Sequence, residues 1–94
     1  MSTEHIHARD SVLCAVYRSP KKEGMYLYVP KTETPFEQVP EPLLQRFGVP
    51  GHVLDLELTP ARKLARVSAA DVIKGLREHG FYLQMPPGEF TQEI

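Results

Sequence analysis

The chain is poor in cysteine and has no long apolar segment. Cys14 is its one cysteine, which excludes an intramolecular disulfide and is typical of a protein in a reducing compartment. No apolar run approaches the roughly 18 residues that a membrane-spanning helix needs. The N-terminal residues 1–10 are polar and lack the apolar core of a secretory signal. We therefore expect a soluble cytoplasmic protein in which Cys14 is a small buried residue.

The sequence also lacks the motifs of common catalytic sites. It contains no glycine-rich phosphate loop and no Gly-x-Ser-x-Gly motif, and no pattern places a base beside Cys14. His5 and His7 are alternate residues near the N-terminus, but a zinc site needs three or four preorganised ligands. We expect neither enzymatic activity nor a bound metal or cofactor.

A strong net charge is absent as well, although the charge is unevenly spread. The 94 residues carry −1 in total, which argues against a protein that is basic throughout. Between Pro60 and His79, five basic and two acidic residues give +3. The remainder, with six basic and ten acidic residues, carries −4. Such an asymmetry is typical of an interaction surface.

What is present is the composition of one globular domain. Hydrophobic residues make up 41% of the chain and charged residues 24%, and the length fits a single domain. Neither end shows a periodic pattern, and chain ends fray unless they are tied down. We expect a flexible leader over residues 1–11, the domain over residues 12–87 and a loose tail over residues 88–94.

Local patterns predict four strands and two helices. Apolar runs bounded by turn residues predict strands over 12–18, 25–29, 52–58 and 81–85. A short helix is expected over 43–47, and a longer one over 69–79 with Ser68 as N-cap and Gly80 as its stop. A helical turn is expected over 59–64. The order β-β-α-β-α-β predicts an α+β fold, a mainly antiparallel four-stranded sheet with both helices packed on one face as a two-layer sandwich.

Alternation within the strands predicts two faces of this sheet. The core face would carry Leu27, Val29, Leu54, Leu56, Leu58, Phe81, Leu83 and Met85. The opposite face would carry Tyr26, Tyr28, Val53, Asp55, Glu57, Tyr82 and Gln84. The strand over 12–18 is apolar at nearly every position, so its orientation stays open.

Several segments resemble the YcgL family of small bacterial proteins. The run CAVYRS from Cys14, followed by MYLYV from Met25, is similar to the opening hairpin of that family, and the ending GFYLQMPP from Gly80 is the most distinctive part. Val39-Pro40, Phe47-Gly48 and Arg62-Lys63-Leu64 resemble the rest of its pattern. The resemblance implies a compact α/β fold but no activity, cofactor or site residue. Genes of this family lie beside one for a ribonuclease D-like exonuclease in some genomes, which implies a link with RNA metabolism.

One candidate contact surface is basic. It consists of Arg62, Lys63 and Arg66, extended by Lys74 and Arg77 on the following helix. Such a cluster could meet phosphates or an acidic protein surface. The plainer interpretation is a solvated charged face. The Lys21-Lys22 pair at the hairpin tip would extend the cluster if it lay close by.

The second candidate surface is the tyrosine face, Tyr26, Tyr28 and Tyr82, joined by Gln84 and Arg18. RNA-binding sheets stack bases on exposed aromatic rings, and this face would do so if no helix covered it. Asp55 and Glu57, predicted on the same face, would repel phosphates. The plainer interpretation is that the rings pair across strands or pack against loop residues such as Phe36.

Together these patterns predict a non-enzymatic binding or adaptor protein whose partner is a protein or single-stranded RNA. Two alternatives remain open. Asp55, Glu57 and the tyrosines could converge on a pocket for a small ligand or for carboxylate chemistry. Burial of the tyrosine face could instead form a dimer.

Overall fold

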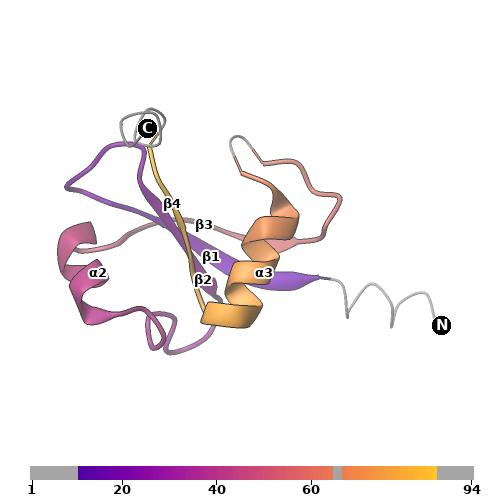
Figure 1. The fold of residues 1–94 in the computed structure, drawn as a ribbon, viewed down its shortest axis with the longest axis horizontal. Helices are drawn as coiled ribbons and strands as arrows, with labels where there is room; N and C mark the ends of the chain where they lie inside the picture. The colour runs from indigo at the N-terminus through magenta and orange to yellow at the C-terminus, as the bar shows by residue number, and fades with distance from the viewer. Residues whose placement is uncertain (1–10, 65–66, 87–94) are drawn as a thin grey trace.

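The computed structural model describes residues 11–64 and 67–86, and its elements follow the predicted order (Figure 1). The strands are β1 (Val12–Arg18), β2 (Tyr26–Pro30), β3 (Gly51–Leu58) and β4 (Tyr82–Gln84). The helices are α2 (Glu41–Phe47) and α3 (Ala69–His79). Arg66, the predicted tail and all of the predicted leader except Ser11 lie outside the described residues.

The residues that were expected to begin and end the helices do so. The Ser68 hydroxyl accepts a hydrogen bond from the Asp71 amide at 3.3 Å, and Gly80 takes the left-handed conformation that closes α3. Pro42 lies in the first turn of α2, where its missing N–H costs nothing. The helical turn expected over 59–64 is shorter, because the Arg62 amide bonds the Thr59 carbonyl and Lys63 then bridges to Ser68.

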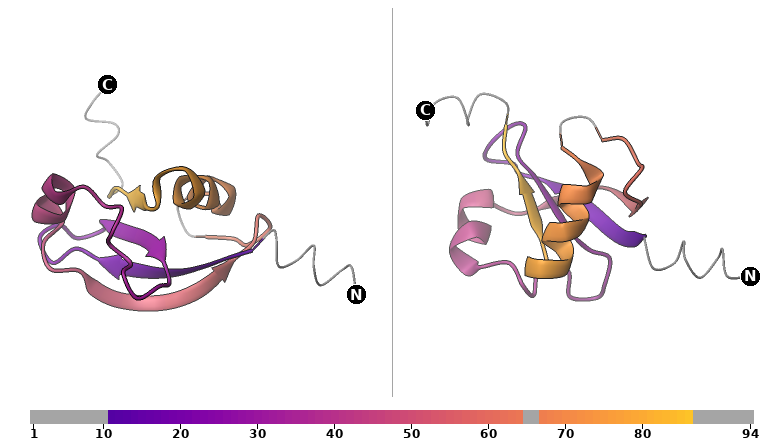
Figure 2. Two further views of the ribbon diagram at one scale, coloured as in Figure 1. Left: turned by 90° about the horizontal axis from the view of Figure 1, so that it is seen from below. Right: turned by 45° about the vertical axis from the view of Figure 1, so that its right-hand side comes forward.

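The sheet is antiparallel throughout, in the order β3-β1-β2-β4. The hairpin of β1 and β2 forms its centre, and β3 and β4 lie at the two edges (Figure 2). The ladder between β1 and β3 shifts register at Val16 and Tyr17, near the start of β3. The predicted α+β class and antiparallel sheet are therefore confirmed. The hairpin of β1 and β2 is a local pairing, whereas β3 pairs with β1, which is distant in sequence.

The helices are placed differently from the prediction, because they lie on opposite faces of the sheet. Cys14 and Val16 of β1 pack in one cluster with the buried stripe of α3, whereas Ala15 packs in a second cluster with Phe47 of α2. Successive strand residues point to opposite faces. The sheet thus lies between α2 and α3, as Figure 1 shows, and the centre of β1, Cys14 to Val16, is buried on both sides.

The predicted faces are confirmed for β2 and β4 and corrected for β3. Leu27, Val29 and Leu83 share the face under α2, as expected. Leu56 and Leu58, which were predicted to lie with them, pack instead with Tyr28 under α3. The physical reason is the register: Leu56 pairs with Cys14 and not with Ala15, so the leucines of β3 follow the α3 side.

Candidate functional site

Helix α3 covers the tyrosine face, so the condition for base stacking there is not met. Tyr28 is only 7% exposed, and its hydroxyl donates to Gln84 Oε1 at 3.0 Å. Its ring meets that of Tyr82 edge-on at 6.1 Å between centroids. Tyr26 and Tyr82 are half-buried in the same cluster. These rings pack beneath α3. This agrees with the interpretation that the tyrosines serve packing rather than base stacking.

The carboxylates of β3 lie on the face opposite the tyrosines, which corrects the predicted shared face. Asp55 pairs with Ala15 and therefore points to the α2 side. Its carboxylate contacts His52 Nε2 at 2.8 Å and Lys31 Nζ at 3.2 Å. The hydrogen bond from His52, followed by that from Lys31, lowers the pKa of Asp55. A pocket formed by Asp55, Glu57 and the three tyrosines is therefore excluded.

Cys14 is fully buried in the α3 cluster, as the sequence predicts. Burial, and then the negative charge of Asp55, raises the pKa of the thiol from 9.0 to about 11. Within residues 11–64 and 67–86, no three His, Cys, Asp or Glu side chains are grouped to hold a metal ion. Because Cys14 is buried and its pKa is raised, its thiol stays neutral at physiological pH and is shielded from reagents in solution.

We expect Cys14 to resist thiol reagents in the folded protein at pH 8, where only about one thiol in a thousand is ionised, and to react once denaturant is added.

The raised pKa of Cys14 also makes the folded protein less stable at alkaline pH. Above about pH 9 the unfolded thiol loses its proton while the folded one keeps it, so the free energy of unfolding falls by about 2–3 kcal/mol by pH 11. Urea titrations from pH 8 to 10, with Cys14→Ala as control, measure this slope. An equal slope in both proteins would contradict it.

The basic candidates lie in the segment that leads into α3 and on the exposed face of that helix. Arg62 Nη1 reaches the Glu57 carbonyl at 3.4 Å, and Lys63 is held beside the N-cap Ser68. A hollow of about 270 Å³ brings Pro60 close to Lys74 and Arg77 on the outer face of α3, and the carboxylate residue Glu78 also lines it. We call Arg62, Lys63, Lys74 and Arg77 the basic surface; all four are exposed. Arg66 lies outside the described residues.

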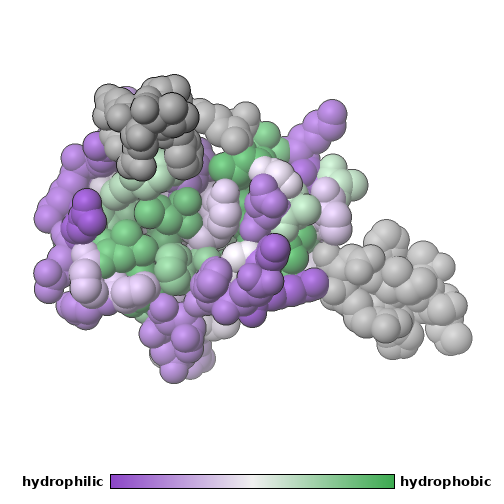
Figure 3. Space-filling view, viewed as in Figure 1, coloured by the Kyte–Doolittle hydropathy of each residue, from purple (hydrophilic) through white to green (hydrophobic). Residues whose placement is uncertain are grey.

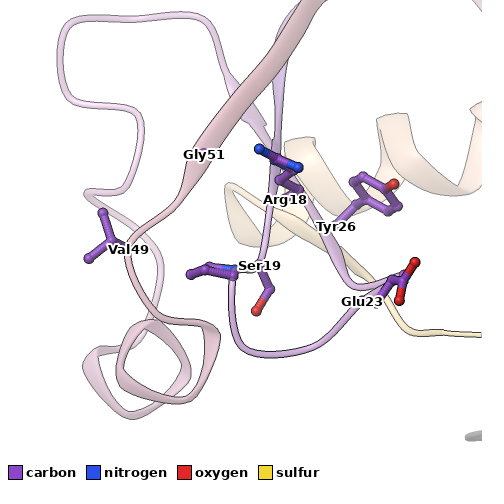
Figure 4. A pocket seen from close by; sticks show the side chains of 8 residues that line it. Arg18, Ser19, Glu23, Tyr26, Val49 and Gly51 are labelled. Carbon is purple, nitrogen blue, oxygen red and sulfur yellow. The ribbon is translucent and has the colours of Figure 1, made fainter.

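Arg18 lies away from the basic surface, at the hairpin end of the sheet. It lines a hollow of about 430 Å³ with Tyr26, Glu23 and Val49 (Figure 4). Gly51 forms part of the wall, and a Cβ there would come 3.4 Å from Arg18 Nε. Within the described part of the chain, the Arg18 guanidinium and the Glu23 carboxylate form no hydrogen bond or ion pair. We call this the Arg18 hollow.

Sequence reasoning found Arg18 and Tyr26 but missed Glu23, Val49 and Gly51 of this hollow. The strand pairing could have indicated these residues. Arg18 of β1 pairs with Tyr26 of β2 on one side and with Gly51 of β3 on the other. The Ser19 hydroxyl fixes the adjoining turn by donating to the Phe47 carbonyl at 2.6 Å and accepting from the Lys21 and Lys22 amides. The turn beside the hollow is therefore fixed by hydrogen bonds between the Ser19 side chain and the backbone.

Neither helix of the described chain is long and apolar enough to cross a bilayer.

Comparison with known proteins gives one consistent result. The family described as the YcgL domain matches residues 14–87. A YcgL domain-containing protein of Pseudomonas paraeruginosa is 56% identical over 77 residues, which cover 82% of this chain and 78% of the relative. One from Saccharophagus degradans is 54% identical over 72 residues, 77% of this chain and 78% of the relative. One from Pseudomonas fluorescens is 52% identical over 77 residues, with coverage of 82% and 78%.

Proposed function

The chain belongs to the YcgL domain family, and we propose that it is a non-enzymatic binding protein of the bacterial cytoplasm that contacts an acidic partner protein through its basic surface. The main support is the hollow that joins Pro60 to Lys74 and Arg77. Pro60, which stands two residues before Arg62 in the sequence, thereby lies close to Lys74 and Arg77 of α3. The buried free thiol of Cys14 suits a reducing compartment.

A protein partner fits this surface better than RNA. Pro60, Ala70 and Ile73 give the hollow an apolar lining, so a partner side chain could be buried between the cations. Base stacking would need exposed rings, whereas Tyr28 is buried and Tyr26 and Tyr82 are half-buried in the cluster under α3. A partner segment with one apolar side chain flanked by acidic residues would match both the apolar lining and the surrounding cations.

The two sequence-based alternatives change accordingly. A dimer through the tyrosine face loses its surface, since α3 occupies that face. A small ligand would bind in the Arg18 hollow rather than at Asp55 and Glu57, because the hollow has the size of a ligand pocket and its Arg18 guanidinium has no partner among residues 11–64 and 67–86. Amide shifts confined to Ser19, Gly24 and Gly51 would identify such a ligand.

The test is a titration of the isotopically labelled chain with an acidic peptide and, separately, with a short single-stranded RNA, each at low and moderate salt. We expect the peptide to shift the amides of Lys63, Lys74 and Arg77, and the shifts to weaken as salt screens the charges. Lys74→Glu should weaken peptide binding at this surface about tenfold, since it replaces attraction by repulsion.

Arg46→Glu is the matched control, because Arg46 is an exposed cation on α2, on the other side of the sheet. It should leave the shifts at Lys63, Lys74 and Arg77 unchanged. Shifts at these amides with RNA but not with the peptide would replace the protein partner by RNA and support a link with RNA metabolism. No shift there with either probe at millimolar concentration would overturn the proposal.

A further inference from the structure

A second cationic site, with a larger apolar lining, lies on the α2 side of the sheet. Met25, Leu43, Leu83 and Met85 line a groove of about 260 Å³. Lys21, Lys22 and Arg46 form its rim. We call this set of seven residues the apolar groove. Figure 3 shows apolar surface between α2 and β4, bordered by hydrophilic residues.

The groove exists because α2 is too short to cover its face of the sheet. Phe47 fills the centre of the cluster, but Leu83 and Met85 remain half-buried at its edge. Methionine side chains, which are flexible and polarisable, suit a surface that adapts to a partner.

The cations at the rim are positioned by the fold. Lys21 Nζ donates to the Gln45 carbonyl of α2 at 2.9 Å, which holds the hairpin turn against the helix. Ser19 bonds the Phe47 carbonyl beneath it, so the rim is tied to α2 at two points. Arg46 lies in the last turn of α2, beside the same groove. Among the described residues, three cations and no carboxylate line the groove.

We propose that the apolar groove is a docking site for an acidic peptide segment of a partner protein, with one aromatic or aliphatic side chain as its anchor. The anchor fills the methionine and leucine lining, and flanking carboxylates meet Lys21, Lys22 and Arg46. Charge complementarity selects the acidic flanks, and burial of the anchor supplies most of the affinity. The groove lies across the sheet from the basic surface, so the inference is independent of the function proposed above.

The test uses the full labelled chain and a capped peptide, Glu-Glu-Phe-Leu-Glu-Glu, at low salt. We expect amide shifts at Lys22, Met25, Leu43, Leu83 and Met85. The same peptide with glutamine in place of glutamate should bind at least about tenfold more weakly, and so should the unmodified peptide to Arg46→Glu. Arg62→Glu makes the same charge change on the α3 side and should leave binding at the groove unchanged.

Three results would overturn the proposal. One is the absence of groove shifts at millimolar peptide, and the second is equal binding of the glutamine peptide or by Arg46→Glu. The third is a set of groove shifts that appears only when residues 88–94 are deleted. That result would assign the groove to the C-terminal segment of this chain, where Glu89, Phe90 and Glu93 have the same chemistry.

Discussion

Phe47→Ala is expected to lower the free energy of unfolding by about 3–5 kcal/mol, because it removes a buried ring and leaves a cavity. Phe47 is completely buried and packs in the cluster of Ala15, Leu27 and Val29 under α2. A domain of this size has only about 5–15 kcal/mol of total stability. The variant should therefore lose a large share of its stability.

Urea denaturation followed by circular dichroism measures the loss. Phe47→Leu is the matched control and should cost less than about 1.5 kcal/mol, since it keeps most of the apolar volume. The hydrogen bond from Ser19 to the Phe47 carbonyl is present in both variants, so it does not affect the comparison. A loss below about 1 kcal/mol for Phe47→Ala would mean that α2 does not close this side of the sheet.

Gly75→Ala should lower the free energy of unfolding by about 1–3 kcal/mol, although alanine is the better helix former by roughly 1 kcal/mol. Gly75 lies on the side of α3 that faces Tyr82 of β4. A Cβ there would come 2.9 Å from Tyr82 Cδ1 and 3.2 Å from the Phe81 carbonyl oxygen. Because one of these atoms belongs to the backbone, relief requires a shift of the helix or of β4.

Lys74→Ala is the control for this substitution, since Lys74 is the exposed neighbour and its change should stay within about 0.5 kcal/mol. Chemical denaturation of both variants shows whether the free energy of unfolding rises or falls. A stabilising Gly75→Ala would show that α3 stands further from the tyrosine face than the structure places it, and the basic candidates on α3 would then be arranged differently.

The elements of this fold could be predicted because their signals are local. Ser68 and Gly80 mark the ends of α3 within the sequence itself, and the strand over Val12–Arg18 was found with its observed limits. Turn residues such as Gly24, with a positive φ of 89°, likewise act through their own backbone. These features need no information from distant parts of the chain.

The arrangement of the two helices could not be predicted, because it depends on register between strands. β1 is apolar on both faces, so its sequence is compatible with a helix on either side or on both. The position of Leu56 opposite Cys14 decides that the leucines of β3 face α3. Nothing within β3 itself fixes that choice, since alternation defines two faces but not which helix covers each.

For the candidate site, too, the residues could be predicted from the sequence but their arrangement in space could not. Arg62 and Lys63 were identified from charge alone, and the fold places them beside the N-cap of α3, close to the hollow that holds Lys74 and Arg77. Lys21 was expected to extend that cluster if it lay nearby. It instead bonds Gln45 on the α2 side, where it borders the apolar groove. Charge is visible in a sequence, but the face that carries it depends on the tertiary fold.

Helix α3 packs over the tyrosine face and α2 packs on the opposite face, so partners are left to meet the cations around the two helices rather than the tyrosines. The most direct test is solvent paramagnetic relaxation, measured by NMR on side-chain signals with a soluble gadolinium chelate. The ring signals of Tyr28, which is 7% exposed, should be protected, whereas the methyl signals of Val49, 82% exposed, should broaden strongly. Equal broadening of Tyr28 and Val49 would contradict the structure and return the tyrosine face to the candidate contact surfaces.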